Sequence, residues 1–500
     1  MPLDSLDLPS CGTMARLLSA PPHAPWPAFV PRAGLGGELS ARNPYGLVNG
    51  ATSEHFAMWW GSQAPGFVEG DANTLLESFE VAWAAEIEEW GHQAPYGMDR
   101  FLFNVVLADS GEQSPSSYGA GAYYYLDPAG YPVIVFSEDS TFDPDWQAST
   151  AAHEFYHAIQ DAAARYPYEG VSAWYWEASA EWAAGEVYPE NPYGGSFIAS
   201  RAFLRYLPIS AFDYFDTGSL AEYVQYGSFI SLQHLTEVVD VTLVPRSWTD
   251  TTGVGDPWAV LSALIAADGG DLAQMWLDQQ ARDVTWDYPQ HDLYASTVAQ
   301  WAAYYPDQAA DQIAAVHADQ GVAPGEHVPK ALYPQHFGAN IIELRSAGGD
   351  LIVDVGGDEF GSEGSAAGWG ARVVRRVCDE TSSSSSTDCF VVTELVPFEG
   401  NIGHLDMPYS EAAGYDAWLV VGAFSLEPTA DRWETETFEY TYGLASTGIV
   451  ETVPTTEEGV FQALDHARIV CGCESSRGAF STGFGGFWVA AFGVMRRHRE

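Results

Sequence analysis

One helix is specified more strongly than any other part of this chain. Asp143 is a suitable N-cap, and Pro144 suits the first helical position. His153 and His157 are four positions apart, so a helix presents both imidazole rings on one face, each about 2.0 Å from a shared metal ion. Glu154 is rotated by about 100° and can reach a metal-bound water without binding the metal. This HExxH arrangement predicts two zinc ligands and a general base.

A third ligand is expected on the next helix, which "AWYWEASAEWAAGEVY" predicts over residues 173–188. Nineteen residues separate His157 from Glu177. A second helix packed across the first would bring the Glu177 carboxylate to the metal and leave a fourth position open for water. The alternative is a helix that carries two partly buried histidines and no metal. That alternative requires the spacing, the caps and the second acid to coincide by chance.

The spacing and the E-x-x-x-E form of the second segment resemble the gluzincin metallopeptidases, the group that includes thermolysin. The resemblance implies that Glu177 is the third zinc ligand and that Glu181 orients a ligand histidine. The segments "HEFYHAIQ" and "YWEASAEWAAGEVYP" are similar to secreted bacterial metalloproteases of the myxobacterial type, over roughly residues 54–445. The implied fold is α+β, with a zincin-type domain made of a mixed sheet, an active-site helix and a helical lobe.

Two related groups of zinc peptidases fit less well. A metzincin would need glycine at position 160 and histidine at position 163, whereas this chain has Gln160 and Ala163. The aminopeptidase branch of the gluzincins carries a Gly-x-Met-Glu-Asn segment, and the sequence has none. The pattern therefore favours an endopeptidase.

Peptide hydrolysis also needs a hydrogen-bond donor that stabilises the tetrahedral intermediate. Gluzincins take it from a downstream tyrosine or histidine, and "LAEYVQYGSFISLQHL" offers Tyr223, Tyr226 and His234. Tyr226, beside Gly227 at the start of an apolar helix, is the first choice, although each of the three is also compatible with an ordinary packing role. The strand expected over 131–137 either pairs with an extended substrate at a sheet edge or lies inside the sheet.

Changes in periodicity divide the chain into four parts. Residues 1–50, rich in Pro, Gly and Ala, are expected to be a leader or pro-segment, and residues 51–325 form the expected metallopeptidase domain. From 336 to 445 short strands alternate with Gly, Pro and Ser, which predicts an all-β sandwich. Residues 446–500 are expected to be a linker and a sorting or anchor segment. Further helices are expected over 71–90, with Asp71 or Asn73 as N-cap, and over 197–206, 221–239, 256–282 and 295–317.

The charge of the chain is strongly negative. Sixty-eight acidic and twenty basic residues give a net charge of -48, which makes nucleic acid an unsuitable partner because its phosphates would be repelled. Most of this acidity is expected to form a solvated surface suited to salty surroundings. The acidic loop of Asp354, Asp358, Glu359 and Glu363 is interpreted either as a Ca²⁺ site or as part of that surface.

Features near the C-terminus indicate export. Cys378 and Cys389 flank a polar run typical of a hairpin loop, and a disulfide between them would need an oxidising compartment. The N-terminus lacks the basic and apolar regions of a secretory signal. Close to the end, "VCGCESSRG" precedes seventeen mostly apolar or small residues and then "RRHRE", which predicts a membrane span or a short docked helix. This order resembles the C-terminal sorting signals of myxobacterial surface proteins, which implies a secreted or cell-surface protein.

Two functions from different classes fit these features. The favoured hypothesis is an exported zinc-dependent endopeptidase that acts on protein or peptide substrates, with Glu154 as the general base. The alternative is a surface-displayed adhesion or carbohydrate-binding protein in which the β-sandwich binds the target and the zinc site is vestigial.

Overall fold

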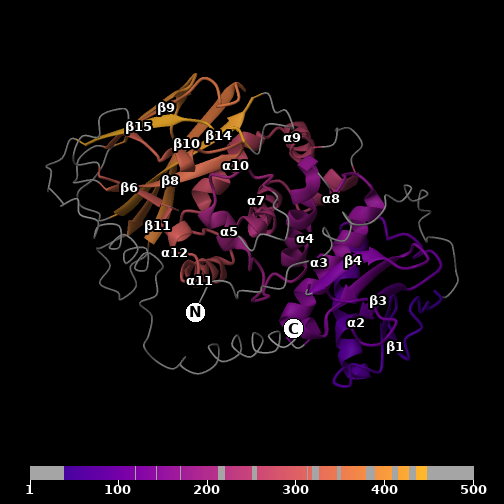
Figure 1. Cartoon of the computed structure of the whole chain (residues 1–500). Coiled ribbons are helices and arrows are strands. Elements are labelled where there is room, and N and C mark those ends of the chain that lie inside the picture. Colours follow the sequence, from indigo (N-terminus) through magenta and orange to yellow (C-terminus); the bar gives the residue numbers. More distant parts are fainter. Residues whose placement is uncertain are drawn as a thin grey trace.

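The computed structural model describes residues 39–446, except for 119, 142, 169, 212–219, 250–255, 312, 318–325, 346–350, 379–388, 408–414 and 427–434. The fold is α+β with an all-β C-terminal region, as predicted. Figure 1 shows the order of the parts across the molecule: an N-terminal sheet at one end, helices in the middle, and the C-terminal strands at the other end.

The N-terminal sheet is mixed, and its strands lie in the order β1-β2-β3-β5-β4. The three inner strands are parallel, whereas β1 and β4 run antiparallel to their neighbours. The predicted strand over 131–137 is therefore an interior strand, and β4 is the edge strand on that side. The bounds are β1 Asn49–Thr52, β2 Phe56–Trp60, β3 Phe103–Leu107, β4 Ala122–Leu126 and β5 Pro132–Phe136.

Two long helices pack against this sheet, α2 (Glu69–Trp83) and α3 (Pro144–Ala163). The Asp143 carboxylate caps α3 as predicted, accepting the backbone N–H groups of Asp145 and Trp146 at 3.0 and 3.2 Å. The predicted cap of α2 is wrong. That helix begins two residues before Asp71, whose carboxylate accepts the backbone N–H of Val68 at 2.8 Å from inside the first turn. A π-helical turn, Ala84–Glu89, extends α2 at its C-terminal end.

The helical lobe differs from the prediction at three places. The helix expected over 221–239 is a 3₁₀ turn, Leu220–Tyr223, followed by two helices, Val224–Gly227 and Phe229–Val238. The helix expected over 256–282 is two helices, because Gly269 adopts a φ of 84° between them. The helix expected over 295–317 ends at Ala302, a short helix starts at Pro306, and Ile313–His317 form a strand. The bounds are α4 Ala173–Val187, α5 Ile198–Phe203, α6 Val224–Gly227, α7 Phe229–Val238, α8 Leu243–Thr249, α9 Pro257–Ala267, α10 Leu272–Arg282, α11 His291–Ala302 and α12 Pro306–Asp311, with short 3₁₀ turns at Glu138–Thr141, Gly170–Ser172, Leu220–Tyr223 and Lys330–Leu332.

The C-terminal region contains two five-stranded sheets, in the orders β11-β10-β14-β8-β6 and β12-β13-β9-β15-β7. Their facing sides bury one apolar cluster, with residues such as Ile342, Val353, Val373, Leu419 and Leu444. The bounds are β6 Ile313–His317, β7 Glu326–His327, β8 Gly338–Arg345, β9 Leu351–Gly357, β10 Ala367–Cys378, β11 Cys389–Leu395, β12 Phe398–Glu399, β13 Ile402–Met407, β14 Tyr415–Ser425 and β15 Tyr440–Ser446. Two strands of this region, β6 and β7, therefore lie before residue 336, where the β-sandwich was predicted to begin.

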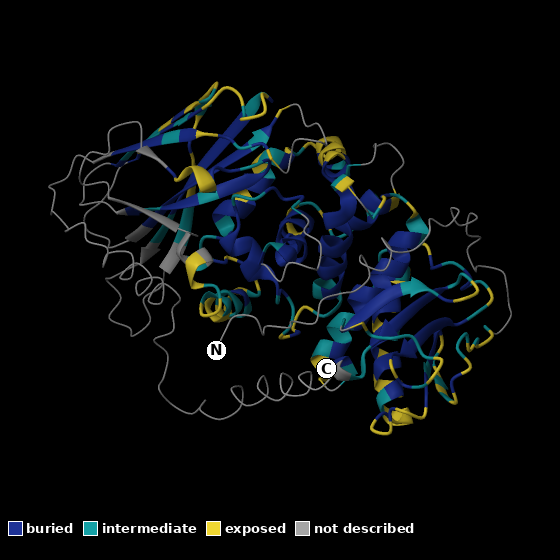
Figure 2. Ribbon diagram, viewed as in Figure 1, coloured by how far each residue is buried: buried dark blue, intermediate teal, exposed yellow. Residues whose placement is uncertain are grey.

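The first of these two sheets also packs against the helical lobe. Val374, Trp418 and Val420 alternate with the inward-facing residues and join the main core, which also contains Trp276 and Leu277 of α10, a helix that contacts β10 and β14. Figure 2 shows the resulting band of buried residues running from the strands into the helices. The helical lobe and the C-terminal sheets therefore share a core.

Several predictions fall on parts of the chain that the structure leaves undescribed. Residues 1–38 and 447–500, with most of the expected leader and the whole expected sorting segment, lie outside the described residues. β10 and β11 form the predicted hairpin, and Cys378 lies opposite Cys389 in its register, but the two side chains lie outside the description. Within the described ranges, no helix has the length and apolar character needed to cross a membrane.

Candidate metal centre

Three buried side chains converge where α3 and α4 pack together. His153 and His157 come from α3 and Glu177 from α4, and their ligand atoms all lie within 4.8 Å of one another. The His153 Nε2 atom is 3.2 Å from His157 Nε2 and 3.2 Å from Glu177 Oε2. The His157 Nε2 atom is 3.5 Å from Glu177 Oε2. This group could hold a metal ion.

The surroundings of the three side chains fit a cation. Among the described residues, the buried Oε1 atom of Glu177 has no hydrogen-bond partner, so the interior leaves a carboxylate oxygen available. The two imidazole nitrogens also face each other at 3.2 Å. Their lone pairs repel unless a proton or a metal ion lies between these nitrogens and the carboxylate. Two nitrogens and one carboxylate oxygen are a donor set that zinc accepts in catalytic sites.

The electrostatics point the same way. Burial alone would raise the pKa of Glu177, but its contacts with His157 and His153 lower that pKa to about 2. Burial alone would lower the pKa of His153, but its contacts with Glu177 and Glu181 raise that pKa to about 10. A proton and a metal ion therefore compete for the same lone pairs at this site.

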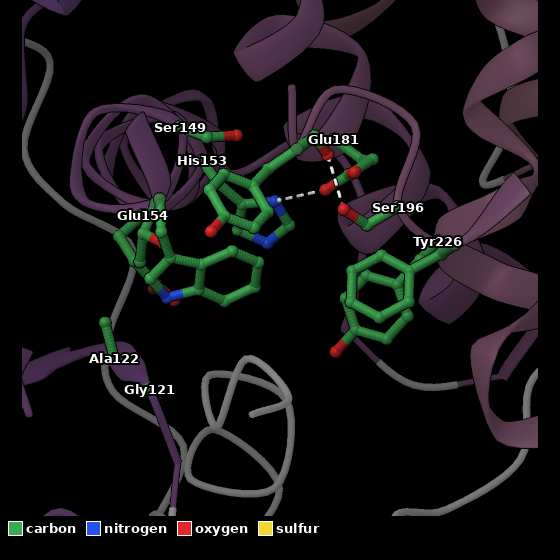
Figure 3. Close-up of a pocket in the computed structure, with 12 residues that line it drawn as sticks. Gly121, Ala122, Ser149, His153, Glu154, Glu181, Ser196 and Tyr226 are labelled. Atoms are coloured by element: carbon green, nitrogen blue, oxygen red, sulfur yellow. Dashed lines mark hydrogen bonds and ion pairs between the residues drawn. The ribbon is translucent and has the colours of Figure 1, made fainter. Parts of the chain in front are cut away.

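Each histidine also has a partner behind it. The Nδ1 atom of His153 lies 3.3 Å from the Glu181 carboxylate, the contact drawn as a dashed line in Figure 3. This geometry agrees with the orienting role that the resemblance implied for Glu181. The Nδ1 atom of His157 lies 2.7 Å from Oε1 of Gln160, a residue that the sequence reasoning used only to exclude the metzincins. Gln160 lies about one helical turn after His157, and this spacing was the feature of the sequence that could have indicated the contact.

A pocket opens beside the metal centre, and of the three converging side chains His153 is the one that lines it. In the view of Figure 3, His153 lies between Glu154 on one side and Tyr226 on the other, and Gly121 and Ala122 at the start of β4 form a further wall. Glu154 is 1% exposed and lines this pocket, where it can meet a small molecule such as water. Aromatic rings of Trp146, Tyr193 and Phe197 complete much of the lining, and none of the described lining residues is a lysine or an arginine.

Of the three candidate hydrogen-bond donors, Tyr226 alone lines the pocket. Its ring stacks over His153 with the centroids 6.1 Å apart and packs on Phe197 at 4.8 Å. Tyr223 packs instead against Phe197 and Trp301. His234 lies on α7 with its Nδ1 atom 3.4 Å from Arg282, and burial together with this cation lowers its pKa to about 4.

The acidic loop does not form a comparable site. Within the described ranges, the acids of residues 354–363 do not converge closely enough to hold an ion, whereas His153, His157 and Glu177 do. Asp354 instead pairs with His404 at 2.7 Å. The loop is therefore better described as part of the acidic surface.

The comparison with known protein families places the whole site inside one family. Residues 39–383 match the model of a family of unknown function, DUF6055, which covers more than half of the chain. The chain belongs to DUF6055. No curated protein is detectably similar to it.

The part that this DUF6055 chain shares with its family contains every residue of the candidate metal centre. It includes the N-terminal sheet, the helical lobe and the strands β6 to β10. The matched part ends between β10 and β11, inside the C-terminal region. It therefore includes much of the core that the helices and the strands share. The family description assigns no activity.

Proposed function

We propose that this DUF6055 protein is a zinc-dependent endopeptidase of the gluzincin type. The observation that carries the proposal is the buried group of His153, His157 and Glu177, which opens through His153 onto a pocket that Glu154 also lines. A structural zinc site is closed by four protein ligands, whereas a catalytic site keeps one position for water or substrate. Three converging ligands next to a cavity fit the catalytic kind.

Zinc bound here would act as a Lewis acid that makes water more acidic and polarises a carbonyl group. Glu154 would accept a proton from the attacking water and later donate it to the leaving amine nitrogen. Tyr226, on the other side of His153, would donate a hydrogen bond from its hydroxyl to the carbonyl oxygen as negative charge develops there. Glu181 would hold the His153 ring in place through Nδ1.

An extended peptide would bind along β4. Among the described strands, β4 pairs only with β5, and its first residue, Ala122, lines the pocket together with the preceding Gly121. A strand edge offers backbone N–H and C=O groups that bind a peptide by β-augmentation. The hydroxyl of Tyr124 on β4 donates to Asp161 of α3 at 2.5 Å, which ties this edge to the helix that carries the histidines. Protein and peptide chains are therefore the proposed substrates.

Export to the cell surface belongs to the same proposal. It depends on the C-terminal segment, which lies outside the described residues, and on the resemblance of that segment to sorting signals. The adhesion alternative assigns the function to the β-strands instead. The base, the orienting acid and the pocket beside the three ligands favour catalysis over that alternative.

The test is hydrolysis of casein by the purified full chain. We expect hydrolysis that a zinc chelator stops and added zinc restores, because removing the ion removes the Lewis acid. In parallel, the same preparation is applied to a glycan array. Absence of hydrolysis by zinc-loaded protein together with selective glycan binding would overturn the proposal in favour of adhesion.

A further inference from the structure

Gln160 is a fully buried polar residue that touches both helices of the metal centre. It lies on α3, and its Oε1 atom is 2.7 Å from Nδ1 of His157. Its Nε2 atom donates to two groups of α4, the backbone oxygen of Trp176 at 2.9 Å and the hydroxyl of Ser179 at 3.0 Å. Trp176 directly precedes Glu177 in the chain, so one side chain connects a ligand of α3 with the segment that presents the ligand of α4.

The hydrogen-bond partners on α4 determine whether the nitrogen or the oxygen of the Gln160 amide faces that helix. A backbone oxygen such as that of Trp176 can only accept a hydrogen bond. The Ser179 hydroxyl uses its one proton to donate to the backbone oxygen of Tyr175 at 2.5 Å, so it too must accept from Gln160. The amide nitrogen of Gln160 therefore faces α4, and its oxygen faces His157.

The same logic fixes the proton on His157. An amide oxygen accepts and cannot donate, so Nδ1 of His157 must carry a proton. In a neutral imidazole only one ring nitrogen is protonated, and the other keeps its lone pair. The nitrogen that keeps the lone pair is then Nε2, which faces His153 and Glu177.

We propose that Gln160 is a positioning residue that sets the tautomer of His157 for metal binding. The inference rests on the proposed zinc site, and it deepens that site by assigning a role to a residue outside the three ligands. The two histidines are then held differently, His153 by the Glu181 carboxylate and His157 by a neutral amide. An amide at the fully buried position orients the ring without burying one more negative charge.

The first test is the protonation of His157 in metal-free wild-type protein, measured by ¹⁵N NMR of labelled histidine. Its signals are assigned as those lost in the His157→Gln variant. We expect a proton on Nδ1. A His157 ring whose Nδ1 carries no proton would overturn the inference, and this measurement needs neither bound zinc nor a Gln160 variant.

The second test is zinc affinity in competition with a chelator. Gln160→Met has a similar shape but no polar atoms at the amide, and we expect it to bind zinc about 10–100-fold more weakly. Gln160→Glu, as a neutral acid, can accept from His157 and donate to Trp176, so it should recover most of the loss. Gln147→Met is the matched control, because Gln147 is also a buried glutamine of α3, six residues before His153 and outside the group of three ligands.

The outcomes separate this inference from the proposed function. If wild-type protein binds no zinc, the proposed function fails, whereas the NMR result still reports on Gln160. If wild-type protein binds zinc and folded Gln160→Met binds it equally tightly, the positioning role of Gln160 fails and the zinc site stands. Folding of each variant is checked by its circular dichroism spectrum before the titration.

Discussion

Replacing Glu154 by glutamine is expected to lower the kcat for peptide hydrolysis by about 10²–10⁴-fold, the range typical of a lost general acid–base group. Glutamine has nearly the same shape but cannot accept a proton from the attacking water. Zinc affinity should remain at the wild-type level, because Glu154 is not one of the three converging ligands. The measurements are the turnover of a quenched fluorescent peptide and the zinc content of the same sample.

The matched control for this variant is Asp145→Asn. Asp145 is an exposed acid in the first turn of the same helix and does not line the pocket. Its amide should leave turnover unchanged, which separates the loss of a base from the loss of one negative charge on α3. A Glu154→Gln enzyme that hydrolyses the peptide at the wild-type rate contradicts the proposed mechanism.

Local signals made the helix that carries the two histidines predictable, and non-local pairing made other elements unpredictable. The cap at Asp143 and the proline after it act within one turn, so the start of α3 could be located from the sequence. Residues Ile313–His317 look helical because alanine favours helices, yet they pair in parallel with β8. That partner lies more than twenty residues later, and tertiary pairing outweighs the small local preference.

In the candidate site, too, features set by local spacing could be predicted and features set by tertiary packing could not. The convergence of His153, His157 and Glu177 could be predicted, since a helix period and one inter-helix spacing suffice to bring them together, whereas the place of Glu181 beside His153 was implied by the resemblance to the gluzincins. The edge position of β4 depends on the order of strands in the sheet, which no local pattern in the sequence encodes. The role of Gln160 depends on which groups of α4 face it, and that also requires the packed structure.

Replacing Glu177 by alanine is expected to weaken zinc binding by roughly three orders of magnitude. Structural zinc sites in zinc-finger peptides bind with about 10–16 kcal/mol, which is up to about 4 kcal/mol for each of four ligands, and a loss of that size corresponds to roughly three orders of magnitude in affinity. Hydrolysis should fall with zinc occupancy and recover in part at high zinc concentration. The measurement is zinc affinity from chelator competition on purified protein.

Glu186→Ala controls for the loss of an acid from the same helix. Glu186 lies near the end of α4, away from the three ligands, so its removal should leave zinc affinity unchanged. Stoichiometric, tight zinc binding by Glu177→Ala would exclude Glu177 as the third ligand, even if His153 and His157 remain ligands.

The most direct measurement is anomalous diffraction at the zinc absorption edge from crystals of the full chain grown with zinc. The account predicts one strong anomalous peak about 2.0–2.2 Å from Nε2 of His153, Nε2 of His157 and a carboxylate oxygen of Glu177, on the side of the pocket that Glu154 lines. No anomalous peak between these three side chains, in crystals that hold zinc elsewhere, would contradict the central claim.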